Sequence, residues 1–253
     1  MIENKKYNDT FFDEMEKSSY ISAKNVMPLV YNLVPFKSVV DIGCGTGVWL
    51  KVCRDELGIS DIQGIEGPYL KKEKVKIPFE NITLTDLKEP LKVNKKYDLV
   101  MSLEVGEHLP DSCSDIFVQS LANAGDVILF SAAIPGQEGT YHINEQYPEY
   151  WAAKFLKAGF VPVDIIRKSI WNNSDVAWWY RQNILLMVKK EKLKEFPELE
   201  ACASTTDPGF LTRIHPEIFN LKTKHIAKTS TILGLLDFKW YEFKTKYLKG
   251  NGK

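Results

Sequence analysis

The densest group of chemically active side chains lies in the segment SLEVGEHLP, residues 102–110. Glu104, Glu107 and His108 fall within five residues at the end of an expected buried strand. Carboxylate oxygens favour Mg²⁺ or Mn²⁺ over Zn²⁺, and an imidazole can join such a ligand set. The segment therefore predicts a divalent metal site. In the alternative, Glu104 packs beside a bound cofactor while Glu107 and His108 cap the next helix.

A second group begins in SVVDIGCGTGVWL, residues 38–50, where an apolar strand leads into Gly43, Gly45 and Gly47 before a helical pattern. Glycine lets the backbone turn sharply and approach a ligand closely. The N-terminus of the following helix favours a carboxylate or a phosphate. The segment predicts a nucleotide-type cofactor loop, and a tight turn without a ligand is its alternative.

Acids at the ends of two later strands narrow the choice of ligand. IQGIEG places Glu66 where a carboxylate can accept hydrogen bonds from both hydroxyls of a ribose. NITLTDL places Asp86 at the end of the third strand, suited to an adenine amino group, and Leu87 offers its backbone N–H. Three strand ends that face one groove form the arrangement that ligand sites in open α/β sheets require.

Together, DIGCGTG, Glu66, Asp86 and the strand YDLVMSLEVGEHLP resemble the successive motifs of class I S-adenosylmethionine (SAM)-dependent methyltransferases. The resemblance implies that the glycine loop lies under the methionine part of SAM, with Glu66 at the ribose and Asp86 at the adenine. The expected cofactor contacts are Asp41, Gly43, Cys44, Gly45, Glu66, Asp86, Leu87 and Glu104. An NAD-dependent oxidoreductase shares the fold, but the CGTG turn and Asp86 argue against it. A non-catalytic SAM-binding subunit is a further alternative.

The spacing of Glu104, Glu107 and His108 resembles that in the metal-assisted O-methyltransferases of ubiquinone biosynthesis and in the small-RNA 3′-terminal methyltransferases. There a histidine from a later loop completes the set, which implies His142 in GTYHINEQ as the fourth ligand. A metal could hold an acceptor hydroxyl and lower its pKa. Without a metal, His142 or His108 is the expected general base, because imidazole titrates near neutral pH. We therefore expect both histidines to be catalytic.

Polar side chains after the fifth strand indicate the kind of acceptor. The stretch provides donors, acceptors and one aromatic face through Gln137, His142, Asn144, Glu145, Gln146 and Trp151. Such a set suits a polar, hydroxyl-rich substrate. With the later WWYRQN, it resembles small methyltransferases of surface-polysaccharide (capsule) biosynthesis clusters. The resemblance implies O-methylation of a sugar, a nucleotide-activated sugar or a phosphoramidate precursor.

The elements that must position these residues alternate between apolar strands and helical stretches. This order predicts an α/β fold, a doubly wound, mostly parallel seven-stranded sheet of the Rossmann-like class I methyltransferase type. FVPVDIIRKSIW, residues 160–171, and NILLMVKK, residues 183–190, are the last two expected strands, which would pair antiparallel. The aromatic WWYR between them is expected to pack into the core rather than to stack on nucleic-acid bases.

We expect three regions. They are an N-terminal helical lid over residues 1–35 with one or two amphipathic helices, a SAM-binding core over 36–190, and a C-terminal helical appendage over 191–253. The segment ILGLLDFKWYEFKTKYLKG within the appendage is expected to be a docked helix, with a membrane-surface or partner helix as the alternative.

Composition excludes several classes of protein. Lys+Arg and Asp+Glu balance at 33 each, so no overall field favours nucleic acid, and the expected partner is a small polar molecule. The four cysteines form no CxxC pair and fit a reducing compartment. No leader pattern or apolar run of roughly 18 residues is visible, so the expected location is cytoplasmic. The composition predicts no particular oligomeric state.

Overall fold

The computed structural model describes residues 9–229, 236 and 239–240. The chain divides into two units, Met1–Arg213 and Ile214–Lys253. The first unit carries the sheet, and the second contributes helix α8 (Pro216–Thr229). This division falls later than the boundary expected after residue 190. Most of the segment expected to form a docked terminal helix, residues 232–250, lies outside the described residues.

A seven-stranded sheet with the order β3-β2-β1-β4-β5-β7-β6 forms the centre of the first unit. Its strands are β1 (Ser38–Ile42), β2 (Asp61–Glu66), β3 (Ile82–Leu84), β4 (Leu99–Leu103), β5 (Val127–Ser131), β6 (Phe160–Val163) and β7 (Leu185–Lys189). All neighbours pair in parallel except β7, which runs antiparallel to both β5 and β6. The expected doubly wound sheet with two antiparallel last strands is confirmed. Because β1 pairs with both β2 and β4, the strand order reverses beside it, where open α/β sheets bind ligands.

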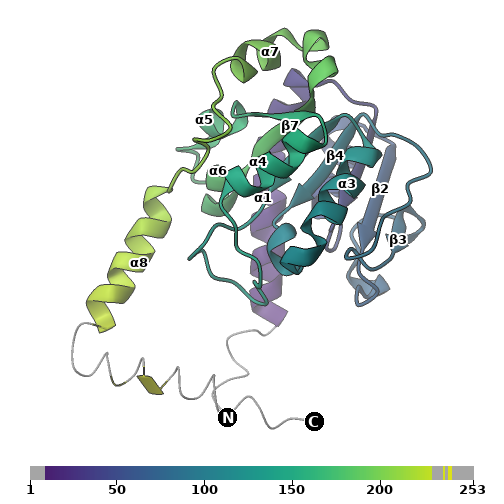
Figure 1. Cartoon of the computed structure of the whole chain (residues 1–253). Helices are drawn as coiled ribbons and strands as arrows, with labels where there is room; N and C mark the ends of the chain where they lie inside the picture. The colour runs from purple at the N-terminus through teal and green to yellow at the C-terminus, as the bar shows by residue number, and fades with distance from the viewer. Residues whose placement is uncertain (1–8, 230–235, 237–238, 241–253) are drawn as a thin grey trace. The chain divides into compact units, whose positions relative to one another are not determined.

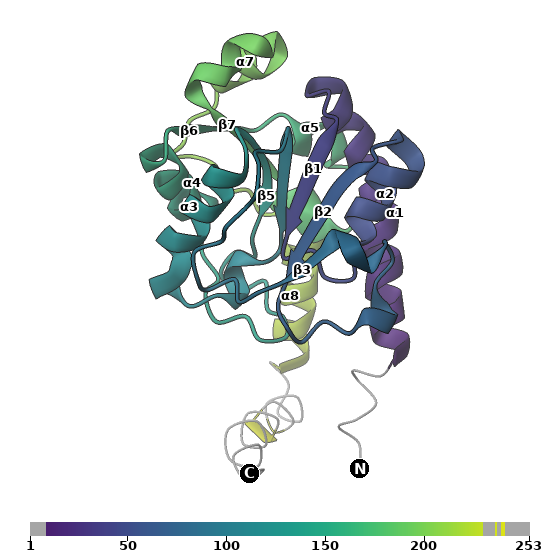
Figure 2. The same cartoon turned by 90° about the vertical axis from the view of Figure 1, so that its right-hand side faces the viewer.

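Helices cover both faces of this sheet (Figures 1 and 2). The first unit contains α1 (Asp9–Leu33), α2 (Val48–Leu57), α3 (Ser114–Ala124), α4 (Pro148–Lys157), α5 (Ile166–Ile170), α6 (Trp178–Asn183) and α7 (Pro197–Ala203). Single-turn 3-10 helices lie at Lys72–Lys74, Phe79–Asn81, Gly106–His108 and Asp111–Cys113, and a longer one lies at Lys190–Glu195. None of the described helices has the length and apolarity needed to cross a membrane.

The core has two halves, one on each face of the sheet. Successive residues of β1 belong to different halves: Val39 packs with α1 and α2, and Val40 packs with α3 and α4. All five positions of β1, β4 and β5 are buried, as expected for strands covered on both faces. Hydrophobic burial on both sides thus fixes the register of the strands whose ends carry the candidate site.

One expectation about local structure was wrong in detail. The run expected to be one long strand over residues 160–171 ends at Val163 and continues as α5, because Ile166 and Ile170 are four residues apart and both buried. The guanidinium of Arg167 donates to both oxygens of Asp164, at 2.7 and 2.6 Å, which holds this first turn. The aromatic segment lies between the last two strands, as expected, and forms the helix α6.

Residues 191–213 pack on the sheet domain. Leu199 of α7 is completely buried in the same half of the core as α1. Arg167 donates to the backbone oxygen of Leu211 at 2.9 Å, and Glu149 of α4 accepts from the backbone nitrogens of Leu211 and Thr212 at 2.7 and 2.6 Å. These contacts explain why the first unit extends to Arg213.

Candidate functional site

The loop between β1 and α2 contains three glycines with positive φ angles, 84° at Gly43, 55° at Gly45 and 83° at Gly47. A Cβ atom on Gly43 would lie 2.4 Å from a methyl group of Val105, so this glycine lets the loop pack on the turn after β4. A Cβ atom on Gly45 would meet nothing within 4 Å. The loop therefore packs against Val105 at Gly43, and at Gly45 it borders free space into which a ligand could bind.

Two residues of this loop do not present their side chains to that space. Cys44 is 5% exposed, and its sulfur lies 2.7 Å from the place where a Cβ on Gly64 would stand. The thiol therefore points beneath the loop, and burial raises its pKa. Thr46 instead donates to Glu16 of α1 at 3.2 Å, so α1 reaches the loop. Cys44 is thus left with only its backbone as a possible cofactor contact.

Asp41, in β1, is an acid of which only 2% is exposed. Its Oδ1 atom has no hydrogen-bond partner among the described residues. Burial and, secondarily, the charge of Glu66 raise the pKa of Asp41 to about 8. A buried acid of this kind favours a cationic ligand, because a nearby positive charge stabilises its ionised form.

Glu66, at the end of β2, is already hydrogen-bonded by the protein. Its Oε2 accepts from the backbone nitrogen of Gly45 at 2.6 Å. Its Oε1 accepts from the backbone nitrogen of Gly67 at 2.7 Å and from the hydroxyl of Tyr69. Sequence reasoning did not identify Tyr69, although a tyrosine three residues after a candidate ribose acid in a turn was a possible signal.

Asp86 and Leu87 follow β3 as expected, and they differ in exposure. Asp86 is exposed and accepts from the backbone nitrogen of Lys88 at 3.0 Å, with the Lys88 ammonium at 3.3 Å. The backbone hydrogen bond from Lys88 is the main cause that lowers the pKa of Asp86. Leu87 is 6% exposed and belongs to the core. An ionised acid therefore lies at the open edge, with an apolar residue beside it.

Glu104 ends β4 with a φ angle of 57°, which places it in the left-handed region. Its carboxylate accepts from Gln137 Nε2 at 2.8 Å and from Asn183 Nδ2 at 3.1 Å. Burial raises the pKa of Glu104, and these hydrogen bonds oppose that effect. Asn183 was not among the expected site residues. Its signal was its position as the last polar residue before an apolar strand.

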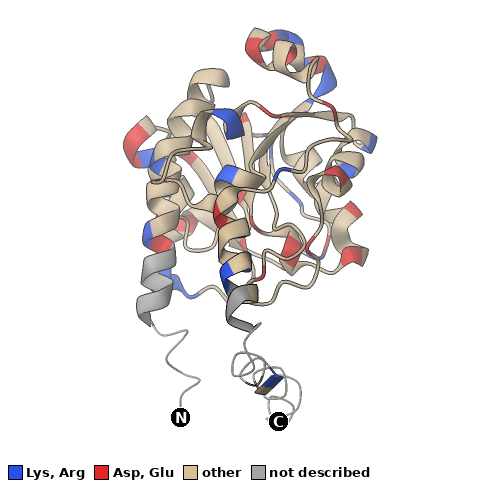
Figure 3. Cartoon of the chain, turned by 90° about the vertical axis from the view of Figure 1, so that its left-hand side faces the viewer, with Lys and Arg blue, Asp and Glu red and all other residues tan. Residues whose placement is uncertain are grey.

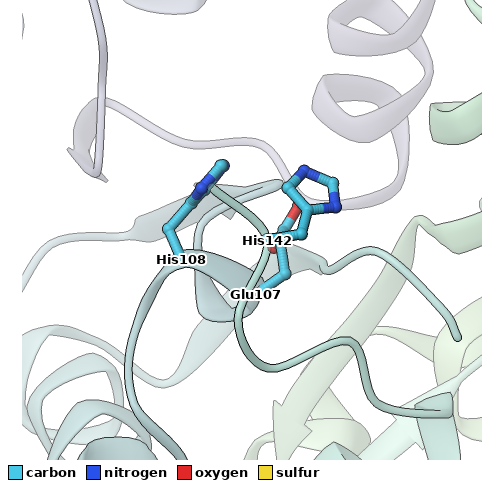
Figure 4. A group of neighbouring side chains, drawn as sticks. All are labelled: Glu107, His108 and His142. Atoms are coloured by element: carbon cyan, nitrogen blue, oxygen red, sulfur yellow. The ribbon is translucent and has the colours of Figure 1, made fainter. Parts of the chain in front are cut away.

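Among the described residues, Glu107, His108 and His142 form a group that could hold a metal ion, here called the metal-ligating group (Figure 4). One possible ligand atom from each lies within 4.8 Å of the others. Glu104, expected as a fourth member, does not belong to this group, because its carboxylate is directed to Gln137 and Asn183. The structure thus brings together three of the four expected ligands.

The electrostatics of these three side chains suit a cation. Glu107 is 0% exposed, and neither of its carboxylate oxygens has a hydrogen-bond partner among the described residues. Burial, with the nearby charge of Glu104, raises the pKa of Glu107 well above its usual range. Burial also lowers the pKa of His108, and His142 adds to this effect. A buried acid without a partner and a neutral imidazole are groups that a bound metal ion would compensate.

The loop after β5 carries His142 to this group. The backbone oxygen of Glu107 accepts from the backbone nitrogens of Ile143 and Asn144, at 2.9 and 3.0 Å. The rings of His108 and His142 meet edge to face, with centroids 4.9 Å apart. The Nδ1 atom of His142 lies 2.9 Å from a carboxylate oxygen of Glu145. The loop is thus attached directly to the turn that holds the other two candidate ligands.

The expected aromatic contributions need correction. Trp151 is 1% exposed and packs against Phe130 and Tyr150, so it belongs to the core rather than to the mouth of the site. Tyr180 and Arg181 are buried in α6, as expected for core packing. In the view of Figure 3, acidic and basic segments are interspersed over the described part of the chain.

Most of this chain is similar to a known domain family. Residues 15–163 match a family model described as a methyltransferase domain, which is more than half of the chain. A search of curated proteins found none that matches.

Solved structures with a similar fold include the following three proteins. The sugar N-methyltransferase KedS8 from Streptoalloteichus sp is 16% identical, with 72% of this chain and 92% of that chain covered and a TM-score of 0.56. Streptomyces venezuelae DesVI is 15% identical, with 74% and 99% covered and a TM-score of 0.54. Human N-acetylserotonin methyltransferase, solved in complex with SAM, is 16% identical, with 71% and 55% covered and a TM-score of 0.50. At these identities the likeness concerns the fold.

Proposed function

Since this chain belongs to the methyltransferase domain family and is a SAM-dependent methyltransferase, we propose that it transfers the methyl group to a hydroxyl oxygen with the help of a divalent metal ion. The proposed acceptor is a sugar, a nucleotide-activated sugar or a phosphoramidate precursor of a surface polysaccharide. The observation that carries the proposal is Glu107, a buried carboxylate without a partner beside two histidines. Family membership argues against the alternative of an NAD-dependent oxidoreductase. A non-catalytic SAM-binding subunit stays the second alternative, and it would bind SAM without turning over any acceptor.

Four features support a SAM site along the ends of β1, β2 and β3. Asp41 offers an unpaired buried oxygen toward the cationic methionine part, and Gly45 leaves space above the loop. Glu66 supplies a carboxylate for the ribose, and the exposed Asp86 one for the adenine amino group. These roles remain proposals.

The affinity for SAM is expected to rise with pH up to about 8, where the raised pKa of Asp41 lies, and then to level off. Below that pH free Asp41 is protonated, and a cationic ligand favours its ionised form, so binding must release a proton. Titration calorimetry in buffers of different ionisation enthalpy measures this release. In Asp41→Asn both the proton release and this rise should disappear. Persistence of both in the variant would assign them to another group.

Phenylalanine in place of Tyr69 is expected to tighten SAM binding by roughly 3- to 10-fold, the worth of one competing hydrogen bond. Glu66 has about four acceptor positions, of which Gly45, Gly67 and Tyr69 take three, so a ribose diol needs the one held by Tyr69. Calorimetry with SAM gives the change. Tyr141→Phe, on an exposed tyrosine of the later loop, is the control and should leave the affinity unchanged. Weaker binding by Tyr69→Phe would mean that the hydroxyl contacts SAM itself.

Transfer of a methyl group is an in-line displacement, so the protein contributes mainly alignment and removal of the acceptor proton. Glu107, His108 and His142 would hold the metal ion, which when bound lowers the pKa of an acceptor hydroxyl. Gln137 and Asn183 donate to the neighbouring Glu104 and hold its carboxylate in place beside this group.

The test starts from protein freed of metal with EDTA. We expect Mn²⁺ to bind at one site by calorimetry, and we expect turnover only with Mn²⁺ or Mg²⁺ present. Formation of S-adenosylhomocysteine is followed over a panel of nucleotide-linked sugars in hydroxyl and amino forms, and ¹H NMR places the methyl group of any product. Methylation of nitrogen would overturn the O-methylation. Full turnover in EDTA would overturn the proposed role of a metal ion. His142 or His108 would then be the expected general base.

A further inference from the structure

We propose that Glu145 is a positioning residue that fixes the orientation and tautomer of His142, so that Nδ1 keeps the proton and Nε2 keeps its lone pair for the site. The inference rests on the proposed function of His142 and adds a residue to it. Glu145 was expected from the sequence only as one of several polar groups of the loop. The geometry gives it a specific partner, because its Oε1 lies 2.9 Å from Nδ1 of His142.

The carboxylate of Glu145 is itself held in place by the loop that surrounds it. Oε1 also accepts from the backbone nitrogen of Glu138 at 2.7 Å, and Oε2 accepts from that of Gly136 at 2.8 Å. The loop places Glu138 at a φ angle of 62°, a conformation that costs energy for a residue other than glycine. With 18% of its side chain exposed, Glu145 can neither rotate freely nor be replaced easily by water.

The hydrogen bond to Glu145 decides which nitrogen of His142 is available. A carboxylate can only accept, so Nδ1 must be the protonated nitrogen. In the neutral ring Nε2 then carries the lone pair, which both a metal ion and an acceptor proton require. A histidine in water prefers the opposite tautomer, with the proton on Nε2. Without Glu145, the ring would therefore lose much of its capacity as a ligand or as a base.

A glycine at position 139 leaves room for the ring of His142 in this orientation. A Cβ atom there would lie 2.2 Å from Nε2 of His142, inside any permitted contact. The side of the ring that carries Nε2 thus faces a backbone without a side chain. Figure 4 shows the ring of His142 beside Glu107 and across from His108, and one possible ligand atom of each lies within 4.8 Å of the others. Because Glu145 holds Nδ1, Nε2 is the nitrogen that the proposal assigns to this group.

The first experiment reads the tautomer in metal-free, ¹⁵N-labelled protein by long-range ¹H–¹⁵N NMR. The chain has four histidines, and the signal lost in His142→Gln assigns the ring. We expect the Nδ1–H form in the wild type and in Glu145→Gln, whose amide oxygen can still accept. Glu145→Ala should move the proton to Nε2. Glu138→Gln, which keeps its backbone donor, is the control and should not change the tautomer.

The second measurement is the affinity for Mn²⁺ without any acceptor. Glu145→Ala should weaken it by about 10- to 100-fold, the usual effect of losing the partner of a ligating histidine, while SAM affinity stays unchanged. A wild-type ring protonated on Nε2, or an unchanged tautomer in Glu145→Ala, would overturn the inference. If the wild type shows the Nδ1–H form but binds no Mn²⁺, the metal proposal fails while the positioning of His142 stands.

Discussion

Glutamine in place of Glu107 is expected to abolish the stabilisation of the protein by Mn²⁺ and to lower turnover by about 100-fold or more. Burial holds the pKa of Glu107 well above its usual range, so without metal the side chain resembles a neutral amide already. The variant should therefore unfold at the same urea concentration as the wild type in EDTA. At a Mn²⁺ concentration about 100 times its Kd, the wild type should gain about 2.7 kcal/mol and the variant almost nothing.

Glu104→Gln is the matched control for this experiment. Both acids lie in the same short segment, but the carboxylate of Glu104 is hydrogen-bonded by Gln137 and Asn183 and is not part of the metal-ligating group. We expect Glu104→Gln to keep the Mn²⁺-dependent gain. If Glu104→Gln loses this gain while Glu107→Gln keeps it, the metal is held by a different set of ligands. Equal loss in both would restore the four-residue set expected from the sequence.

The separation of these two acids shows where sequence reasoning stopped. Their spacing of three residues suggested a common ligand set. Glu104, however, leaves β4 in a left-handed conformation, and Glu107 lies in the 3-10 turn Gly106–His108. Two changes of backbone direction within four residues turn the two side chains in different directions. Glu104 meets Gln137 and Asn183, whereas Glu107 lies beside the histidines. A φ angle of 57° on a glutamate has no signature in the sequence, because glutamate carries no preference for that region.

Apolar runs and glycines in the sequence were sufficient to predict β1 and the loop that follows it. The apolar residues of β1 before Gly43 predicted a strand covered on both faces, and the glycines predicted the loop. The apolar residues after Phe160 were ambiguous, because short apolar runs fit both a buried strand and a buried helical turn. There, the ion pair between Asp164 and the buried Arg167 favours the helix, and it depends on the folded position of Arg167.

Partners distant in the sequence were not predictable. Asn183 contacts Glu104 across 79 residues, and this contact depends on β7 entering the sheet beside β5. Tyr69 is close to Glu66 in sequence, but its role depends on which donors occupy the carboxylate in the folded chain. Such contacts follow from tertiary packing, so no spacing of residues in the sequence predicts them.

Valine in place of Gly45 is expected to reduce the affinity for SAM by more than about 100-fold, because its side chain would enter the space above the loop that a cofactor must use. The backbone at φ 55° also becomes strained, since a left-handed conformation costs a residue with a Cβ about 1–2 kcal/mol. Calorimetry with SAM, together with urea unfolding, separates the two effects.

Gly58→Val provides the control for strain alone. Gly58 ends α2 at φ 71°, and its Cβ would likewise meet nothing within 4 Å, but it lies at the opposite end of the helix from the loop. Both variants should therefore lose a similar free energy of unfolding, while only Gly45→Val loses SAM. Equal loss of affinity in both would attribute the effect to strain in α2. Unchanged affinity in Gly45→Val would mean that the glycine loop does not contact SAM. The roles proposed for the neighbouring Asp41 and Glu66 would then also lose their support.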